Sequence, residues 1–304
     1  MSRVSIEEKI EQLKMEKDAI ILAHYYVPAE VQAVADFVGD SYALAKKAKE
    51  APQRVICFAG VNFMGESAKI LSPEKTVLVP DLEADCPMAH MVTPEKIKDM
   101  REKYEDLAVV CYINSTAEIK EYCDVTVTSS NALKVVSQLS EKNIFFVPDE
   151  NLGRYIAQQL PEKNFIFNDG YCHVHAALTK EQVAAEKERH PAAKVLAHPE
   201  CTGEVLQLAD YIGSTSGIIN HATESDHDEF IICTENGVAY ELKQKNPTKK
   251  FYFIDDGPLC PDMKRITLEK LVNSLESLSP TIEMNETKIQ QAKAPLERML
   301  ELAK

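Results

Sequence analysis

The sequence has few basic residues for its size. Of its 304 residues, 34 are lysine or arginine and 48 are aspartate or glutamate, which gives a formal net charge of −14. A nucleic-acid-binding protein normally carries a basic face, so this balance argues against such a partner. The chain also lacks an apolar run of the roughly 18 residues that a membrane span needs. The longest candidate, residues 19–39, is interrupted by His24, Glu30 and Asp36.

Three further features are missing: an export signal, a C-x-x-C pair and a G-x-G-x-x-G loop. The N-terminal residues MSRVSIEEKIEQLK have the pattern of an acidic amphipathic helix and not of a signal peptide. Without export, the eight cysteines belong in a reducing compartment, as ligands, catalysts or core residues. The missing glycine loop disfavours a flavin or nicotinamide enzyme. We therefore expect a cytoplasmic enzyme that binds neither nucleic acid nor membrane.

One pattern occurs three times along the chain. Each copy opens with a short β-branched strand ending in a polar residue, and closes with a strand followed by an aspartate and a cysteine. The opening strands end 88 and 86 positions apart, at His24, Tyr112 and His198. The closing cysteines stand 86 and 88 positions apart, at Cys86, Cys172 and Cys260. Because strands alternate with helical patterns, we predict an α/β fold of three pseudo-threefold-related α/β/α sandwich domains with parallel sheets.

The repeats also predict the domain boundaries. The expected domains are residues 1–86, 87–174 and 175–266, and the helical tail at 267–304 is expected to pack back on the first domain. In parallel α/β sheets, ligands bind at the carboxyl ends of the strands. A threefold arrangement would point three such edges at one axis, so the active site is predicted at the central interface.

The three closing cysteines would converge on the same axis. Soft thiolates select iron–sulfur clusters or zinc, and three of them leave one metal position open for substrate. The set predicts a [4Fe–4S] cluster whose open iron is a Lewis acid. The alternative is that each cysteine after a strand is a core residue. Cys201, beside His198, is an alternative nucleophile. The other cysteines are interpreted as core residues: Cys57, Cys111, Cys123, Cys201 and Cys233.

A series of short motifs covers nearly the whole chain: AHYY, GDSYALA, GVNFMGESAKIL, ADCPMAHM, YINSTAEIK, TSSNA, PDENLGRY, GYCHVH, HPEC, GSTSG, TENG and CPDMKRIT. In this order they resemble the quinolinate synthase family of NAD biosynthesis. The resemblance implies three domains around a [4Fe–4S] cluster. It also implies condensation of iminoaspartate with dihydroxyacetone phosphate to quinolinate, with release of phosphate and two waters, and a partner enzyme that supplies iminoaspartate. The chain departs from the common family pattern at Tyr25 and Asn62.

These substrates are anionic, so an acidic protein must build a local anion site. Hydroxyls that open helices can supply one, and the alternative role for such hydroxyls is helix capping. The resemblance implies that residues at strand ends and helix starts contact the substrates. These residues are Ser41, Ser129, Ser214, Thr215, His24, His198, Tyr112, Asn114 and His175.

The implied reaction needs proton abstraction beside a carbonyl and two dehydrations, hence a base and a movable acid. Glu200 is the predicted base, and Tyr26 and Tyr112 are the predicted acid/base phenols. Tyr26 with residues 27–30 is a candidate lid over water-sensitive imines. Secondary candidates are Glu235, Asp85 and Lys264.

Three other functions remain open from the sequence. A different cluster-dependent lyase would remove water from one hydroxy acid without a triose phosphate. A non-enzymatic iron–sulfur sensor or scaffold would need the cysteines but not Tyr26, Glu200 and the hydroxyls at equivalent strand ends. A zinc protein would use the same thiols and differ in its absorbance.

Overall fold

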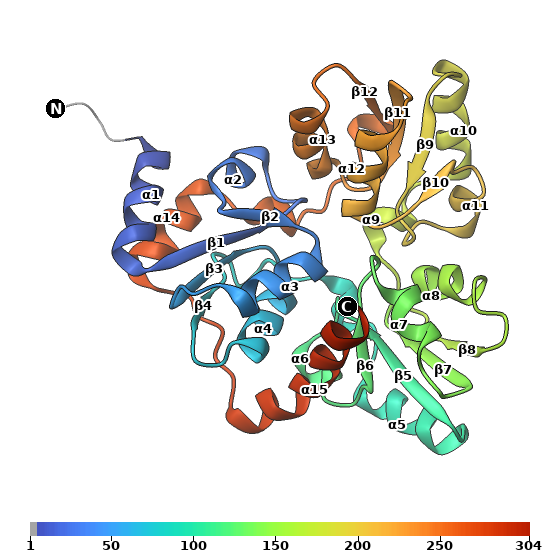
Figure 1. Cartoon of the computed structure of the whole chain (residues 1–304), viewed down its shortest axis with the longest axis horizontal. Coiled ribbons are helices and arrows are strands. Elements are labelled where there is room, and N and C mark those ends of the chain that lie inside the picture. Colours follow the sequence, from blue (N-terminus) through green and yellow to red (C-terminus); the bar gives the residue numbers. More distant parts are fainter. Residues whose placement is uncertain (1–4) are drawn as a thin grey trace.

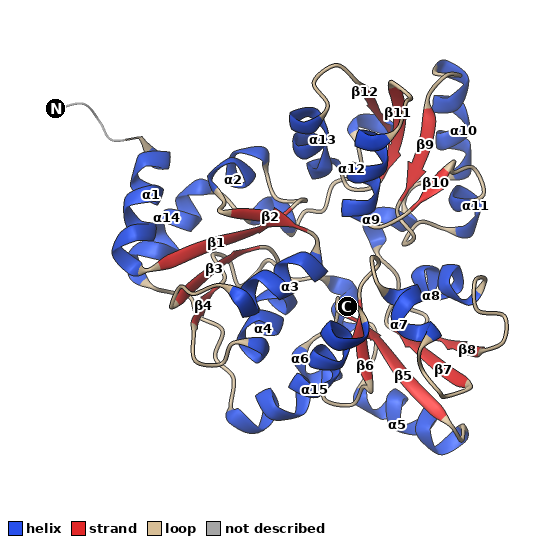
Figure 2. Cartoon of the chain, in the orientation of Figure 1, coloured by secondary structure: helices blue, strands red, loops and turns tan. Residues whose placement is uncertain are grey.

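Three four-stranded parallel sheets surround a common centre in the computed structural model of the chain, which describes residues 5–304 (Figure 1). The strand orders are β2-β1-β3-β4, β6-β5-β7-β8 and β10-β9-β11-β12, so each sheet repeats one topology. Helices pack beside every sheet (Figure 2). The predicted α/β fold with three repeated, pseudo-threefold-related units is confirmed.

The first unit begins with a helix whose start is locally specified. Ser5 and Glu8 form a capping box, in which each side chain accepts the other residue's main-chain N–H. All six residues of the central strand β1 are buried, as expected for a parallel strand covered on both faces. The elements are α1 (Ile6–Lys17), β1 (Ala19–His24), α2 (Ala29–Val34), β2 (Phe37–Gly39), α3 (Ser41–Glu50), β3 (Val55–Ala59), α4 (Asn62–Leu71), β4 (Thr76–Leu78) and the short 3-10 helix η1 (Pro87–His90).

The second unit repeats this order. Thr93 and Asp149 cap α5 and α8 through their side-chain oxygens. The elements are α5 (Pro94–Lys103), β5 (Leu107–Tyr112), α6 (Ala117–Lys120), β6 (Val125–Val127), α7 (Ala132–Ser137), β7 (Asn143–Val147), α8 (Glu150–Ala157), β8 (Asn164–Phe167) and α9 (His173–Ala176).

Apolar clusters cover both faces of the sheet in the third unit, and one of them includes Tyr25 of the first unit. Another cluster spans the first two units, and a further one lies within the second unit. Its elements are α10 (Lys180–Arg189), β9 (Lys194–Ala197), α11 (Gly203–Leu206), β10 (Tyr211–Ile212), α12 (Thr215–Glu224), β11 (Glu229–Cys233), η2 (Asn236–Val238), α13 (Ala239–Lys245), β12 (Lys250–Phe253), η3 (Ile254–Asp256) and η4 (Met263–Arg265).

One aspartate per unit fixes the pairing of the first two strands. Asp36, Asp124 and Asp210 each stand directly before the second strand of their sheet. Each carboxylate accepts a main-chain N–H from the neighbouring first strand, at 2.7 to 2.8 Å. The repeat in the sequence therefore extends to the side-chain contacts that set strand position.

Two helices follow the third unit and return to the others (Figure 1). Helix α14 (Leu268–Ser277) packs against α1, and α15 (Glu286–Leu302) packs against α4, α6 and β6. The Thr126 hydroxyl donates to the Pro295 carbonyl at 3.1 Å, which ties α15 to β6. The tail thus joins the first and second units. The boundaries at residues 86, 174 and 266 stay predictions.

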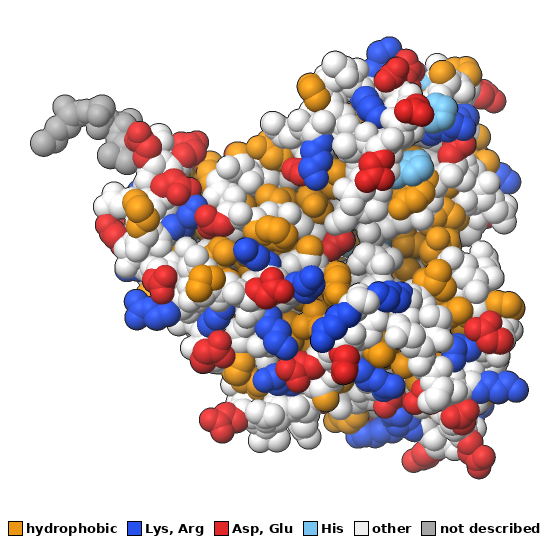
Figure 3. All heavy atoms as spheres, in the orientation of Figure 1, with side chains coloured by type: hydrophobic (Ala, Val, Ile, Leu, Met, Phe, Trp, Pro, Cys, Tyr) orange, Lys and Arg blue, Asp and Glu red, His pale blue; other side chains and the backbone are white. Residues whose placement is uncertain are grey.

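Acidic and basic side chains are interspersed over the face shown in Figure 3. No helix within residues 5–304 combines the length and the apolar character needed to cross a bilayer.

Candidate active site

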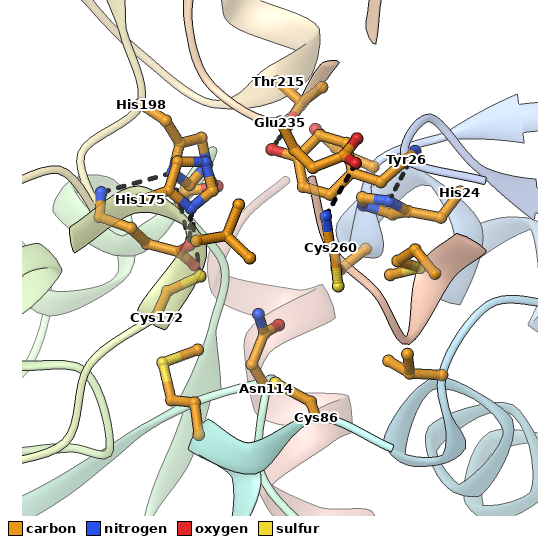
Figure 4. Close-up of a pocket in the computed structure, with 18 of the residues that line it drawn as sticks. His24, Tyr26, Cys86, Asn114, Cys172, His175, His198, Thr215, Glu235 and Cys260 are labelled. Carbon is orange, nitrogen blue, oxygen red and sulfur yellow. Dashed lines mark hydrogen bonds and ion pairs between the residues drawn. The ribbon is translucent and has the colours of Figure 1, made fainter. Parts of the chain in front are cut away.

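The carboxyl ends of the three sheets meet at one central cavity, which holds about 670 Å³ of empty space including its opening. The predicted site residues come together there (Figure 4). The lining includes His24, Tyr26, Ser41, Cys86, Tyr112, Asn114, Ser129, Cys172, His175, His198, Glu200, Thr215 and Cys260.

Some predicted residues lie beside the cavity and not in its lining. Ser214 is the N-cap of α12, and its hydroxyl accepts the Gly217 N–H at 3.1 Å, so its substrate contact stays a prediction. The Asp85 carboxylate forms a 2.6 Å hydrogen bond with His90, and both side chains are exposed to solvent. Glu235 does line the cavity, and it pairs with Lys264 at 2.8 Å. Burial raises the pKa of Glu235, although Lys264 opposes that effect.

The three thiols predicted as metal ligands line the cavity from three units. Cys86 and Cys172 each stand directly before a short helix. Burial raises the pKa of the Cys86 thiol to about 12 and that of Cys260 to about 11. The pKa of Cys172 is raised well above its ordinary value, first by burial and then by Glu200 and Cys86. The thiols are therefore protonated in the metal-free protein.

Glu200 is the centre of the polar contacts in the cavity. Its Oε1 accepts the Tyr112 hydroxyl at 2.5 Å, and its Oε2 lies 2.7 Å from His175 Nδ1. The His198 ring stacks on His175 with centroids 4.6 Å apart. Burial opposes ionisation of Glu200, but His198, His175 and the Tyr112 hydrogen bond outweigh it and hold the Glu200 pKa below its usual range. The carboxylate is therefore ionised at neutral pH.

Tyr26 reaches from the first unit into the third. Its hydroxyl lies 2.8 Å from the hydroxyls of Thr215 and Thr234. Thr234 in turn lies 2.9 Å from His175 Nε2. A continuous hydrogen-bonded chain therefore connects Tyr26, Thr234, His175, Glu200 and Tyr112. Burial, followed by the negative charge of Glu200, raises the pKa of both tyrosines well above the ordinary value.

Thr234 was missed by the sequence predictions, although it is fully buried and central to this chain. It directly follows β11 and begins the TENG motif, so its place at a strand end is the signal that could have identified it.

His24 and His198 occupy equivalent places at the ends of β1 and β9. Each accepts, at Nδ1, the main-chain N–H two residues later: Tyr26 at 3.2 Å and Glu200 at 3.3 Å. This assigns the proton to Nε2 in both rings. Burial lowers the pKa of each histidine to about 3, so both are neutral donors at physiological pH.

A family model described as "Quinolinate synthetase A protein" matches residues 8–301. The chain belongs to this family. Several relatives carry the name quinolinate synthase. One from Fusobacterium nucleatum is 57% identical over 98% of this chain and 99% of its own length. The relative from Clostridioides difficile is 50% identical over 97% of this chain and 97% of its own length. The relative from Caldicellulosiruptor saccharolyticus is 49% identical over 98% of both chains.

Membership of the quinolinate synthase family confirms the resemblance carried by the motifs and makes the chain an enzyme. A non-enzymatic sensor or scaffold does not agree with this result. Because the cavity takes residues from all three units, it exists only when the three units are assembled.

Proposed function

We propose that the protein condenses iminoaspartate with dihydroxyacetone phosphate to quinolinate, releasing phosphate and two waters. Family membership supports the activity. The observation that carries the chemistry is one cavity lined by three thiols together with the Glu200–Tyr112 pair. Since an imine such as iminoaspartate reacts with water, we expect a partner enzyme that supplies it.

The proposed cofactor is a [4Fe–4S] cluster held by Cys86, Cys172 and Cys260. Three soft donors that face one cavity from three sides suit a cluster with one iron left open. Such a cluster, when bound, supplies a Lewis acid at the open iron. The ligands bind as thiolates, so loading must release the protons that the buried thiols hold in the metal-free protein.

Substrate anions are proposed to bind at the strand ends. The neutral rings of His24 and His198 each offer an Nε2–H, and that of His198 lies 3.3 Å from the Ser129 hydroxyl. Ser41 and Thr215 are the first residues of α3 and α12, helices of ten residues each whose N-termini attract negative charge. Asn114 adds an amide to the lining. These groups bind a phosphate and two carboxylates without a cluster of lysines.

Protons are proposed to move along the chain of hydrogen bonds. Glu200 is ionised and can accept a proton, but its lowered pKa makes it release that proton readily. Tyr112 and Tyr26 keep their protons in the resting protein because their pKa values are raised. They can therefore act as acids towards a departing hydroxyl. Thr234 and His175 connect Tyr26 to Glu200, so a proton given at one end can be replaced from the other.

The structure also offers a smaller ligand set for a single metal ion. Donor atoms of Cys172, His175 and Glu200 lie within 4.8 Å of one another, a set that zinc accepts. A zinc enzyme is therefore the second candidate. It differs from the proposed cofactor in one measurable respect, because a zinc site contains no inorganic sulfide.

The test is anaerobic analysis of iron and sulfide, with an absorbance spectrum, on wild type and on Cys86→Ala, Cys172→Ala and Cys260→Ala. We expect about four irons per chain in wild type and loss of the cluster in all three variants. Cys201→Ala, which removes a buried thiol from the core of the third unit, is the matched control and should keep the cluster. Zinc without sulfide in wild type would contradict the proposal. Quinolinate formation from the two substrates is then assayed anaerobically.

A further inference from the structure

We propose that Asp149 and Glu235 are positioning residues for the cluster, each holding the main-chain N–H of one cysteine ligand in place. This inference rests on the function proposed above. It concerns two acids that the hydrogen-bonded chain from Tyr26 to Tyr112 does not use.

Asp149 joins the start of α8 to the loop that carries Cys172. Its Oδ1 accepts the Leu152 N–H at 2.8 Å and so caps the helix, while its Oδ2 accepts the Cys172 N–H at 3.2 Å. The side chain is fully buried. Both carboxylate oxygens are therefore committed, one to the helix and one to the ligand.

Glu235 makes the corresponding contact in the third unit. Its Oε1 accepts the Cys260 N–H at 3.1 Å and pairs with Lys264 Nζ at 2.8 Å. Its Oε2 accepts the Gly237 N–H at 2.7 Å. Lys264 also donates to the Tyr26 carbonyl at 2.6 Å. This fully buried carboxylate thus fixes the Cys260 loop and, through Lys264, the turn that carries Tyr26.

The two acids occupy equivalent places in the repeat. Asp149 and Glu235 each stand two positions after the third strand of their sheet. They precede the cysteine that they hold by 23 and 25 positions. Because the same contact between an acid and a cysteine N–H occurs in two units, we interpret it as a feature of the repeat.

The first unit lacks this device. Val61, two positions after β3, stands where the other units have an acid, and it offers no side-chain acceptor. The Cys86 N–H is accepted instead by its neighbour Asp85, at 2.9 Å. The Asp85 side chain is 40% exposed, and its hydrogen bonds are to its neighbour Cys86 and to His90. The repeats therefore provide two buried supports and one exposed one.

Close packing leaves the supported loops little room to shift. A Cβ added to Gly170 would meet the Pro148 carbonyl oxygen at 2.5 Å, and one added to Gly237 would meet the Tyr25 carbonyl oxygen at 2.6 Å. Holding an N–H at a fixed place restricts the main-chain torsions of the cysteine and hence the direction in which Sγ points. Partners of this kind around a metal site commonly change metal affinity by about 10–100-fold when they are removed.

Amide substitutions test the contact with little change of shape. In Asp149→Asn, the amide oxygen can still accept the Leu152 N–H. The amide NH2 then faces the Cys172 N–H, and two donors cannot form a hydrogen bond. Glu235→Gln likewise loses one of its two accepting oxygens. Glu150→Gln, which changes the acid next to Asp149 that pairs with Arg154 and holds no cysteine, is the matched control.

The experiment loads wild type and the three variants with iron and sulfide anaerobically, and measures the rate of iron loss to a chelator. It also records the electron paramagnetic resonance spectrum of the reduced cluster. We expect iron loss about 10–100-fold faster in Asp149→Asn and Glu235→Gln, with an altered spectrum, and within about twofold of wild type in Glu150→Gln. Thermal unfolding of the metal-free proteins separates this effect from general destabilisation.

Two results would overturn the inference. One is equal rates and spectra in all four proteins. The other is faster iron loss that follows the unfolding midpoint of the metal-free variants, with an unchanged spectrum. A wild-type protein that takes up no cluster at all would instead contradict the function proposed above, so the two failures are distinguishable.

Discussion

The Tyr112 hydroxyl donates a 2.5 Å hydrogen bond to Glu200 Oε1, although the two residues come from different units of the fold. Both side chains are buried, and Glu200 is one of the groups that raise the pKa of Tyr112. A phenol held against an ionised carboxylate keeps its proton until negative charge develops on a nearby oxygen. The Tyr112 phenol is therefore suited to protonate a leaving hydroxyl.

Removing this hydroxyl should slow the reaction more than it weakens binding. For Tyr112→Phe we expect kcat to fall about 10²–10⁴-fold, because a positioned acid contributes on that scale, with KM changed only a few-fold. Steady-state quinolinate formation measures both constants. Tyr104→Phe, at the far end of α5, is the control and should leave them unchanged. A kcat of Tyr112→Phe within twofold of wild type would exclude the acid role.

Thr234 gives a second test, because its hydroxyl connects Tyr26 to His175. Thr234→Val keeps the shape and removes the hydroxyl, so kcat should fall at least about tenfold and its pH profile should shift. Thr234→Ser keeps the hydroxyl and should restore most of the activity. If the valine and serine variants behave alike, the effect is one of packing and the chain does not carry protons.

The sequence predicted the sheets and part of the cavity lining because the repeat places equivalent residues at equivalent strand ends, whereas residues such as Asn114 and His175 were implied by the family resemblance. His24, Tyr112 and His198 end the first strands of three parallel sheets, and the sheets point these ends at one cavity. Periodicity alone was enough for that inference. It needed no knowledge of how the units contact one another.

Contacts across units were beyond the sequence. Thr234 gains its role from Tyr26, which lies 208 positions away. Ser214 and Thr215 are adjacent hydroxyls at one helix start, and only the structure shows that Thr215 lines the cavity while the Ser214 hydroxyl caps α12. The tail was expected to pack on the first domain, and the contacts of α15 with α6 and β6 of the second unit were not predicted, since an amphipathic pattern does not show which unit a helix packs against.

Neutral buried histidine should make stability depend on pH. Burial lowers the pKa of His24 from 6.5 to about 3, although Glu200 opposes this and Lys264 adds to it. Between these two pH values the His24 ring binds a proton in the unfolded chain but not in the native protein. The free energy of unfolding therefore decreases as pH falls below 6.5. The loss is at most about 1.4 kcal/mol per pH unit.

The raised pKa of Glu235 has the opposite effect, because it makes the free energy of unfolding increase as pH falls. The contribution of His24 is therefore measured by comparing wild type with a variant that lacks this histidine. Urea unfolding at pH 7.5, 6 and 5 measures the free energy of unfolding of metal-free wild type and of His24→Gln. The variant should lose less stability than wild type over this range. Parallel curves would mean that His24 is not held neutral by burial.

The packing of α4 against the chain before α15 gives a test of the fold itself. Gly65 lies on the buried face of α4, where an added Cβ would collide with Val79 and press on Ile282 at 3.1 Å. Gly65→Ala should therefore reduce the free energy of unfolding by about 1–3 kcal/mol, as overpacking does. Gly203, the first residue of α11, has no atom within 4 Å of the same added Cβ, so Gly203→Ala should be neutral or stabilising by up to about 1 kcal/mol. Urea unfolding of the metal-free proteins compares the pair. Equal stability of the two variants would show that α4 shifts freely, and the close contact between α4, Val79 and Ile282 would then not be a constraint on the first unit.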